Sequence, residues 1–228
     1  MIPLSEYFNA PVKNCVVLKT DFKIDIDSLQ EYFLKKVKLY NKTLQGNKKY
    51  HGGWSVQSDT GTIGAGWQPG SKAYKLDDTG NRIRDLELEK KMFPFGQSFI
   101  TPTPLYKGPA KLIVDSLIDA GYQSKRTRFS EIDPGGEDPW HVDGGNNTDW
   151  WRGHFAIITN PNASFRFKDA SGNIKSCQIP ADGYFYLANV NVKHSIINHG
   201  VDPRTHLLVD SSKHITKFNV SVEPYLTL

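Results

Sequence analysis

The chain has 228 residues, of which 38% are hydrophobic and 12% aromatic, and its formal net charge is +4. This length and composition predict one well-cored globular domain, or at most two small ones, and exclude a disordered chain. The positive charge gathers in KKVK (35–38) and NKKY (47–50), which are too short for the basic stripe of a nucleic-acid-binding surface, so we expect them on a solvated face.

The two cysteines, Cys15 and Cys177, stand far apart and match no zinc-site spacing or disulfide framework. The N-terminal segment MIPLSEYFNAPVKN lacks the basic and apolar regions of a signal peptide. No apolar run approaches the ~20 residues of a membrane-spanning helix. A cytoplasmic protein with reduced thiols and no membrane association is therefore expected.

The first half of the chain predicts few regular elements. KNCVVLK (13–19) has the character of a strand. Ser28 and Glu31 form a capping-box pattern at the start of a helix over 28–40, with Leu29, Phe33 and Val37 on one face.

The next segment, 41–104, is rich in Gly, Asp, Thr and Pro, with a short strand predicted at WSVQ (54–57). Pro109 in the first turn and Gly121 just past the end delimit a second helix at about 110–120.

From residue 125 onward the pattern becomes that of a β-protein. Turn signals such as DPGG, TNPN, ASGN and PADG separate short strand-like segments. The predicted strands are 125–132, 153–159, 164–169, 174–179, 183–188, 193–198 and 204–210. Together with the helices they predict a mainly β (α+β) fold, a double-stranded β-helix or jelly roll with N-terminal helices packed on it, as a single domain over 1–228.

The segment PWHVDGGNNTDWWRGHF (139–155) holds the first candidate for chemistry. His141 and Asp143 are two residues apart, a spacing that projects both side chains to one face of a strand. A carboxylate and two histidines are the facial triad of non-haem Fe(II) oxygenases. H-x-D alone is a weak signal, so the third ligand decides. Four downstream histidines compete for that place: His194, His199, His206 and His214.

Only His194 is followed, ten residues later, by an arginine that begins a predicted strand. Arg204 has the forked, permanent charge that suits a bidentate carboxylate, and alternation puts His206 on the same face as Arg204. By the same rule Arg152 and His154 share a face and are candidate donors into a pocket. We do not expect His154 to bind metal, because the neighbouring arginine would repel a cation.

The runs PGGEDPWHVD, WWRGHFAIITNP and DGYFYLANVNVKHSIINHGVDPRTHLLVD, within residues 101–210, resemble the aspartyl/asparaginyl β-hydroxylase family. That family belongs to the Fe(II)/2-oxoglutarate-dependent dioxygenases and includes bacterial proline hydroxylases. The resemblance implies Fe(II) bound by His141, Asp143 and His194, and 2-oxoglutarate held by Arg204. Animal-type members have a glycine where Asp143 stands, so this chain is closer to the three-ligand bacterial type.

The resemblance also implies roles around the iron and an amino acid as substrate, free or within a peptide, with O2 as co-reactant. Arg152 and His154 would line the co-substrate pocket, with His206 beside it. Trp54, Trp140, Trp150 and Trp151 would be candidates for the substrate wall. A small molecule or short peptide is favoured, because the chain leaves little room for a peptide-binding domain.

Two other functions stay open at this point. One is nucleic-acid dealkylation, whose enzymes have R-x5-R on the last strand, whereas here Asp210 stands six residues after Arg204. The other is a non-catalytic jelly-roll binding module with structural histidines.

Overall fold

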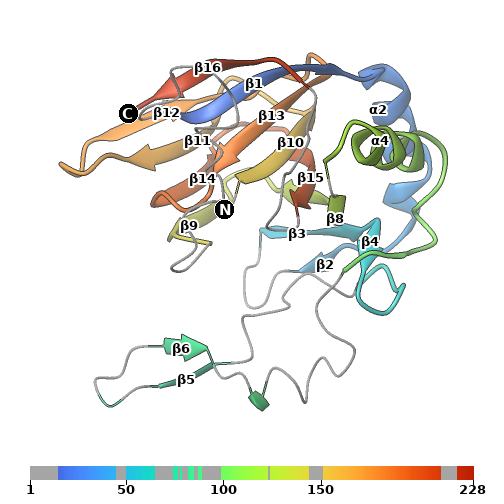
Figure 1. Ribbon diagram of the computed structural model, residues 1–228, viewed down its shortest axis with the longest axis horizontal. Helices are drawn as coiled ribbons and strands as arrows, with labels where there is room; N and C mark the ends of the chain where they lie inside the picture. The colour runs from blue at the N-terminus through green and yellow to red at the C-terminus, as the bar shows by residue number, and fades with distance from the viewer. Residues whose placement is uncertain are drawn as a thin grey trace.

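The protein is seen here in a computed structural model that describes residues 15–44, 50–64, 74–76, 78, 82–84, 87–88, 99–122, 124–143, 151–211 and 220–228. Two antiparallel sheets dominate these residues, and two helices lie beside the larger sheet (Figure 1).

The larger sheet has eight strands in the order β16-β1-β13-β10-β15-β8-β3-β2. Their bounds are β1 (Cys15–Lys23), β2 (Thr43–Leu44), β3 (His51–Ser55), β8 (Ser124–Ile132), β10 (Trp151–Ile158), β13 (Tyr184–Asn189), β15 (Arg204–Ser211) and β16 (Val222–Thr227). The smaller sheet, in the order β12-β11-β14-β9, is formed by β9 (Glu137–His141), β11 (Ala163–Lys168), β12 (Ile174–Cys177) and β14 (His194–Asn198).

Two small antiparallel pairs complete the described strands. They are β4 (Gln57–Ser58) with β7 (Thr101–Pro102), and β5 (Tyr74–Leu76) with β6 (Arg82–Arg84). The mainly β jelly roll with helices packed on it, expected from the sequence, is confirmed by this arrangement.

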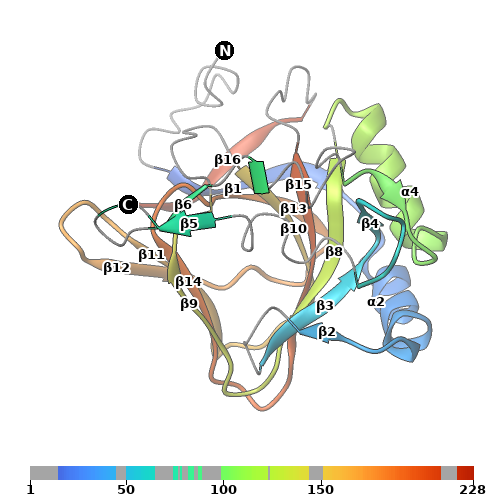
Figure 2. The same ribbon diagram turned by 90° about the horizontal axis from the view of Figure 1, so that it is seen from below.

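The outer face of the larger sheet packs against helices α2 (Ile26–Lys35) and α4 (Gly108–Asp119) (Figure 2). Fully buried Phe129 of β8 packs against Phe33 of α2, with ring centroids 5.3 Å apart. Gln30 of α2 also donates a hydrogen bond to the carbonyl of Ile157 in β10, at 2.7 Å. One apolar cluster therefore joins the helices to the back of the sheet.

The inner face of the larger sheet looks toward the smaller sheet across a second apolar cluster. Phe165 and Phe167 of β11 stack at 4.6 Å and are nearly or completely buried. Ala156 and Tyr186 from the larger sheet complete this layer. In Figure 2 the two sheets diverge like the sides of a V.

The first helix departs from its predicted start. Asp25, and not Ser28, is the N-cap: its carboxylate accepts from the Ser28 backbone N–H at 3.1 Å, so the helix begins at Ile26. The helix ends at Lys35, and a 3-10 turn, η1 (Val37–Leu39), continues the chain where 28–40 was expected as one helix. The second helix lies close to its prediction, with Gly121 at φ 92° just after it.

Among the strands, the prediction at 54–57 is wrong in its bounds, because β3 ends at Ser55 and β4 starts at Gln57. Several described strands were not expected at all, among them β9 and β16. β9 contains Pro139, which breaks the usual strand pattern, and it pairs with β14 along one edge of the smaller sheet. β16 pairs with β1, so both ends of the described chain lie side by side.

Candidate metal centre and its cavity

Three side chains converge at one end of the space between the sheets. His141 comes from the end of β9, His194 from the start of β14, and Asp143 from the segment that follows β9. One potential ligand atom from each residue lies within 4.8 Å of the other two. Register explains the meeting of the histidines, since His141 and His194 are Cα partners across the two strands. The Asp143 backbone N–H donates to the Val190 carbonyl at 3.0 Å, which fixes the third donor.

Both histidines direct Nε2 toward the Asp143 carboxylate. His141 Nδ1 lies 2.6 Å from the Pro139 carbonyl and His194 Nδ1 lies 2.8 Å from the Val192 carbonyl. A carbonyl only accepts, so each Nδ1 carries a proton, and an imidazole in this tautomer has its lone pair on Nε2. His141 Nε2 is 3.5 Å and His194 Nε2 is 3.8 Å from the Asp143 carboxylate. Backbone carbonyls that fix the tautomer of a metal-binding histidine are typical of metal sites.

The protonation states of the triad suit a divalent cation. Burial lowers the pKa of His194 to about 4, so the ring is neutral at pH 7. Burial on its own would raise the pKa of Asp143, but attraction to Arg152, then to His141 and His194, lowers the pKa to about 2. Two imidazoles and one carboxylate are the donor set that a non-haem Fe(II) site uses. The residues present therefore fit the metal.

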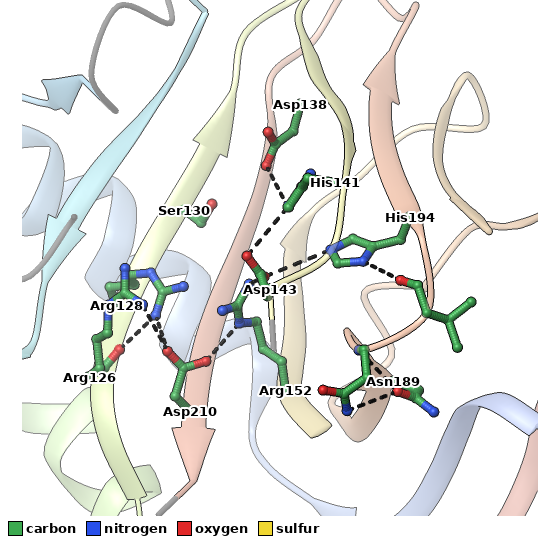
Figure 3. A network of polar contacts seen from close by, with 12 residues as sticks. Arg126, Arg128, Ser130, Asp138, His141, Asp143, Arg152, Asn189, His194 and Asp210 are labelled. Atoms are coloured by element: carbon green, nitrogen blue, oxygen red, sulfur yellow. Dashed lines mark hydrogen bonds and ion pairs between the residues drawn. The ribbon is translucent and has the colours of Figure 1, made fainter. Parts of the chain in front are cut away.

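A charged chain leads away from the metal-facing carboxylate (Figure 3). Arg152 Nη1 donates to Asp143 Oδ2 at 2.5 Å, and Arg152 Nε donates to Asp210 Oδ1 at 2.7 Å. The other oxygen of Asp210 lies 3.0 Å from Arg128 Nη1 and 3.5 Å from Arg126 Nη1. Asp210 is fully buried, and the three guanidinium groups hold the pKa of its carboxyl far below the usual range although burial opposes this.

The expected pocket donors occupy the inner face of the larger sheet. Arg204, 3% exposed, lines the cavity together with His154 and Arg152. Arg204 Nη2 lies 3.2 Å from His206 Nδ1. Because a guanidinium cannot accept, His206 Nδ1 is the acceptor and the proton of the neutral ring is on Nε2. His154 Nε2 and His206 Nε2 are both buried and have no hydrogen-bond partner among the described residues.

The charges of these donors follow from their burial. Burial, followed by repulsion from Arg204, lowers the pKa of His154 and of His206 well below the usual value, so both rings are neutral. Burial also lowers the pKa of Arg204, to about 10, which leaves the guanidinium charged at neutral pH. The described residues place no carboxylate within ion-pair distance of this cation.

The other competing histidines do not join the triad. His199 is exposed in the turn after β14, and its backbone N–H donates to the Asn162 carbonyl. His206 faces Arg204. His214 lies outside the described residues.

Two of the four tryptophans face away from the cavity, contrary to the expected substrate wall. Trp54 is 2% exposed, stacks edge-on against Phe33 at 5.5 Å and donates its Nε1–H to the Tyr40 carbonyl. Trp151 belongs to the same apolar cluster beneath the helices. The physical reason is strand alternation: His51 and Arg152 take the inner positions, so these two tryptophans take the outer ones.

Of the remaining two tryptophans, Trp140 is not among the residues that line the cavity, and the prediction for Trp150 is untested. Trp140 is half-buried against Arg166 and Lys168, whose cationic groups lie 5.1 Å and 4.6 Å from the ring centroid. Trp150 lies outside the described residues.

Several residues of the cavity were not singled out from the sequence. They are His51, Arg126, Arg128, Ser130, Asp138 and Asp210, of which all but Asp210 line the cavity. The alternation R-x-R-x-S in β8 and R-x-H-x-L-x-D in β15 is the signal that identifies four of them. His51 and Asp138 carry no comparable pattern. His51 Nε2 lies 3.0 Å from Ser130 Oγ, and His51 Nδ1 lies 3.5 Å from Asp138 Oδ2.

Neither a protein-family model nor a curated protein sequence matches this chain. The resemblance to the aspartyl/asparaginyl β-hydroxylase family therefore stays a prediction.

Solved structures do resemble it. A Pseudomonas putida prolyl-4-hydroxylase has a TM-score of 0.46 at 10% identity, over 88% of this chain and 94% of that one. An oxidoreductase of the 2OG-Fe(II) oxygenase family from Burkholderia pseudomallei has a TM-score of 0.43 at 10% identity, over 81% and 78%. A cupin domain from Bordetella pertussis reaches 0.31 at 17% identity, over 40% of this chain and 83% of that one. Similarities this distant add no argument about chemistry, which depends on the residues of the site. Among the described residues, no helix is both long and apolar enough to cross a membrane.

Proposed function

We propose that the chain is an Fe(II)- and 2-oxoglutarate-dependent dioxygenase, one domain over residues 1–228, that hydroxylates an unactivated C–H bond of an amino acid, free or in a peptide. The observation that carries the proposal is Arg204. It is a charged group, 3% exposed, that lines the cavity beside the triad, and among the described residues no carboxylate lies within ion-pair distance of it, although Asp138 lines the same cavity. A buried cation is costly without an anion, so the site is suited to a carboxylate ligand.

Iron held by His141, Asp143 and His194 would supply the redox chemistry, in which O2 is consumed, 2-oxoglutarate becomes succinate and CO2, and the substrate gains a hydroxyl group. The protein's part is binding and orientation. Arg204 holds the distal carboxylate of 2-oxoglutarate in a bidentate grip. His206 accepts from Arg204 Nη2 through Nδ1, which holds the guanidinium in place.

The remaining polar groups fix the metal donors. Arg152 holds Asp143 ionised and in place, through the hydrogen bond to Oδ2. The backbone carbonyls of Pro139 and Val192 hold the two imidazole rings. His154 lines the cavity, and its Nε2 has no hydrogen-bond partner among the described residues. His154 is therefore the second residue proposed to contact the co-substrate, after Arg204. The amino-acid substrate rests on the family resemblance.

The test starts with binding. Under anaerobic conditions, Fe(II) and then 2-oxoglutarate should each raise the unfolding temperature, because ligand at 100 times its Kd stabilises by about 2.7 kcal/mol. Succinate release is then measured across free amino acids, short peptides and a methylated oligonucleotide. Amino-acid-dependent or peptide-dependent succinate supports the proposal. Turnover with the oligonucleotide alone would indicate nucleic-acid dealkylation, and no stabilisation by either ligand would contradict the oxygenase assignment.

A further inference from the structure

Two arginines of β8, Arg126 and Arg128, line the cavity at the end far from Arg204. Arg204 and Asp210 are six residues apart on β15, which corresponds to about 20 Å of extended strand. Arg128 and Arg126 meet Asp210 at its Oδ2 atom. The cavity therefore has a cationic group at each end, and Figure 3 shows the end with Arg126 and Arg128 together with the residues of the triad.

The backbone is shaped to bring both arginines to this end. The pairing of β8 with β15 shifts register between Leu208 and Asp210, as a β-bulge does. Arg126 has a φ of 49°, and its backbone N–H donates to the Phe99 carbonyl at 2.8 Å. A residue other than glycine in this left-handed region is strained, and such strain gathers at functional sites. Arg128 Nη1 also donates to the Arg126 carbonyl at 3.0 Å, which orients the second guanidinium.

Electrostatics at this end favours an incoming anion. Burial, then repulsion from Arg128, lowers the pKa of Arg126 to about 9, and attraction to Asp210 does not restore it. Both arginines still carry their charge at neutral pH. Arg152, the third guanidinium near Asp210, also pairs with the metal-facing Asp143. A carboxylate that entered beside Arg126 and Arg128 would reduce the repulsion between them.

The two cationic ends of the cavity are suited to different carboxylate ligands. The Arg204 end is assigned above to the distal carboxylate of 2-oxoglutarate. We infer that Arg126 and Arg128 bind a carboxylate of the substrate, so that the enzyme acts on an amino acid or peptide that presents an ionised carboxylate to this end of the cavity. Leu208, which lies on the cavity face of β15 between the two ends, gives an apolar surface for the hydrocarbon part of such a substrate. This inference rests on the proposed function and narrows its substrate class.

The test compares molecules that differ only in one charge. The probe is the free L-amino acid that gives the most succinate in the panel, beside its primary amide. A side-chain amide is added where the amino acid is dicarboxylic, and a matched pair of acidic and amidated peptides where a peptide is best. Affinity for the anaerobic protein with Fe(II) and 2-oxoglutarate is measured by calorimetry, and succinate release is measured separately.

The wild-type protein should bind the acid about 10- to 100-fold more tightly than its amide, as is usual for hydrogen bonds between charged groups. Arg126→Gln should reduce that ratio at least about tenfold, while Fe(II) and 2-oxoglutarate bind as before. Asp210 keeps Arg128 and Arg152 in this variant, so the fold is expected to persist. Arg128→Lys keeps the charge and loses the fork, and should give an intermediate ratio.

Lys125→Gln is the matched control, since it removes one positive charge from the adjacent position, which does not line the cavity. Its acid-to-amide ratio should equal that of the wild-type protein. Comparing the α-amide with the side-chain amide identifies which carboxylate the arginines bind.

Two results would overturn the inference. The wild-type protein could bind acid and amide equally, or Arg126→Gln could lower the unfolding temperature and leave the ratio unchanged. The second result would mean that these arginines only neutralise Asp210. Failure of the proposed function is a separate result, because there Fe(II) and 2-oxoglutarate would already fail to stabilise the wild-type protein.

Discussion

The two faces of the larger sheet have opposite characters although the same strands form both. On β8, Phe129 is fully buried under the helices, whereas the next residue, Ser130, lines the cavity and contacts His51. On β15, Leu207 belongs to the outer apolar cluster and His206 is on the inner face with Arg204. The strand period of two thus separates stability from function on single strands.

The two faces also contribute to the folding free energy with opposite signs. The inner face holds buried arginines and two neutral histidines, His154 and His206, whose Nε2 atoms have no hydrogen-bond partner among the described residues, and all of these oppose folding. The outer face stacks aromatic rings against the helices, which favours folding. Substitutions on the outer face should therefore change stability, and those on the inner face should change binding.

The largest effect is expected at the metal donors of the cavity. His194→Ala removes one of three ligands and should abolish Fe(II) binding and succinate release, with the fold retained. Calorimetry with Fe(II) under anaerobic conditions measures this. His199→Ala is the control, because His199 is exposed and outside the triad. Loss of iron in the control and not in His194→Ala would refute the choice of third ligand.

The second prediction concerns adjacent residues on the two faces. Phe129→Ala should cost about 3–5 kcal/mol of unfolding free energy, because a cavity opens between Phe33 and the sheet. Ser130→Ala should cost about 1 kcal/mol through the lost contact with His51. Urea unfolding of both variants measures the difference. Equal losses of unfolding free energy would mean that the outer face is not more important for stability than the inner face.

Arg204→Lys tests the end of the cavity assigned to 2-oxoglutarate. It keeps the charge and removes the fork, so affinity for 2-oxoglutarate should fall by about 10- to 100-fold, while Fe(II) affinity stays near the wild-type value. Titration of each ligand separately provides the measurement. If both affinities fell equally, Arg204 would be a structural residue.

The smallest effect is a pH dependence of the inner face. His154 and His206 have pKa values well below the usual 6.5 in the folded protein, because of burial and then of Arg204. Below about pH 6.5 the unfolded chain binds protons that the folded chain does not, so stability falls as pH falls.

The expected loss approaches about 1 kcal/mol per histidine for each pH unit. Urea unfolding of the metal-free protein between pH 7.5 and 5.5 gives the slope. His206→Phe should make that slope shallower, and an unchanged slope would show that His206 is not the residue responsible.

Much of the fold follows from local pattern. Alternation and turn residues predicted the strands from 124 to 211 within a few residues, with the exception of β9, since side chains on a strand alternate whatever their neighbours are. The chain around Pro139 was missed as a strand, because proline removes a backbone donor and is tolerated only on edge strands such as β9. The helix start was misplaced because Ser28 is a good N-cap residue, but so is Asp25, which stands three residues earlier.

For the site, the sequence by itself determined which residues share a face. Alternation puts Arg204 with His206, and Arg152 with His154, and the spacing H-x-D pairs His141 with Asp143. It could not determine which strands are neighbours or which face is inward. Tertiary structure alone placed His194 opposite His141, joined Arg126 and Arg128 to Asp210, and turned Trp54 into the apolar core. The reason is that strand period is a local property of the backbone, whereas sheet order and helix cover come from packing between segments far apart in sequence.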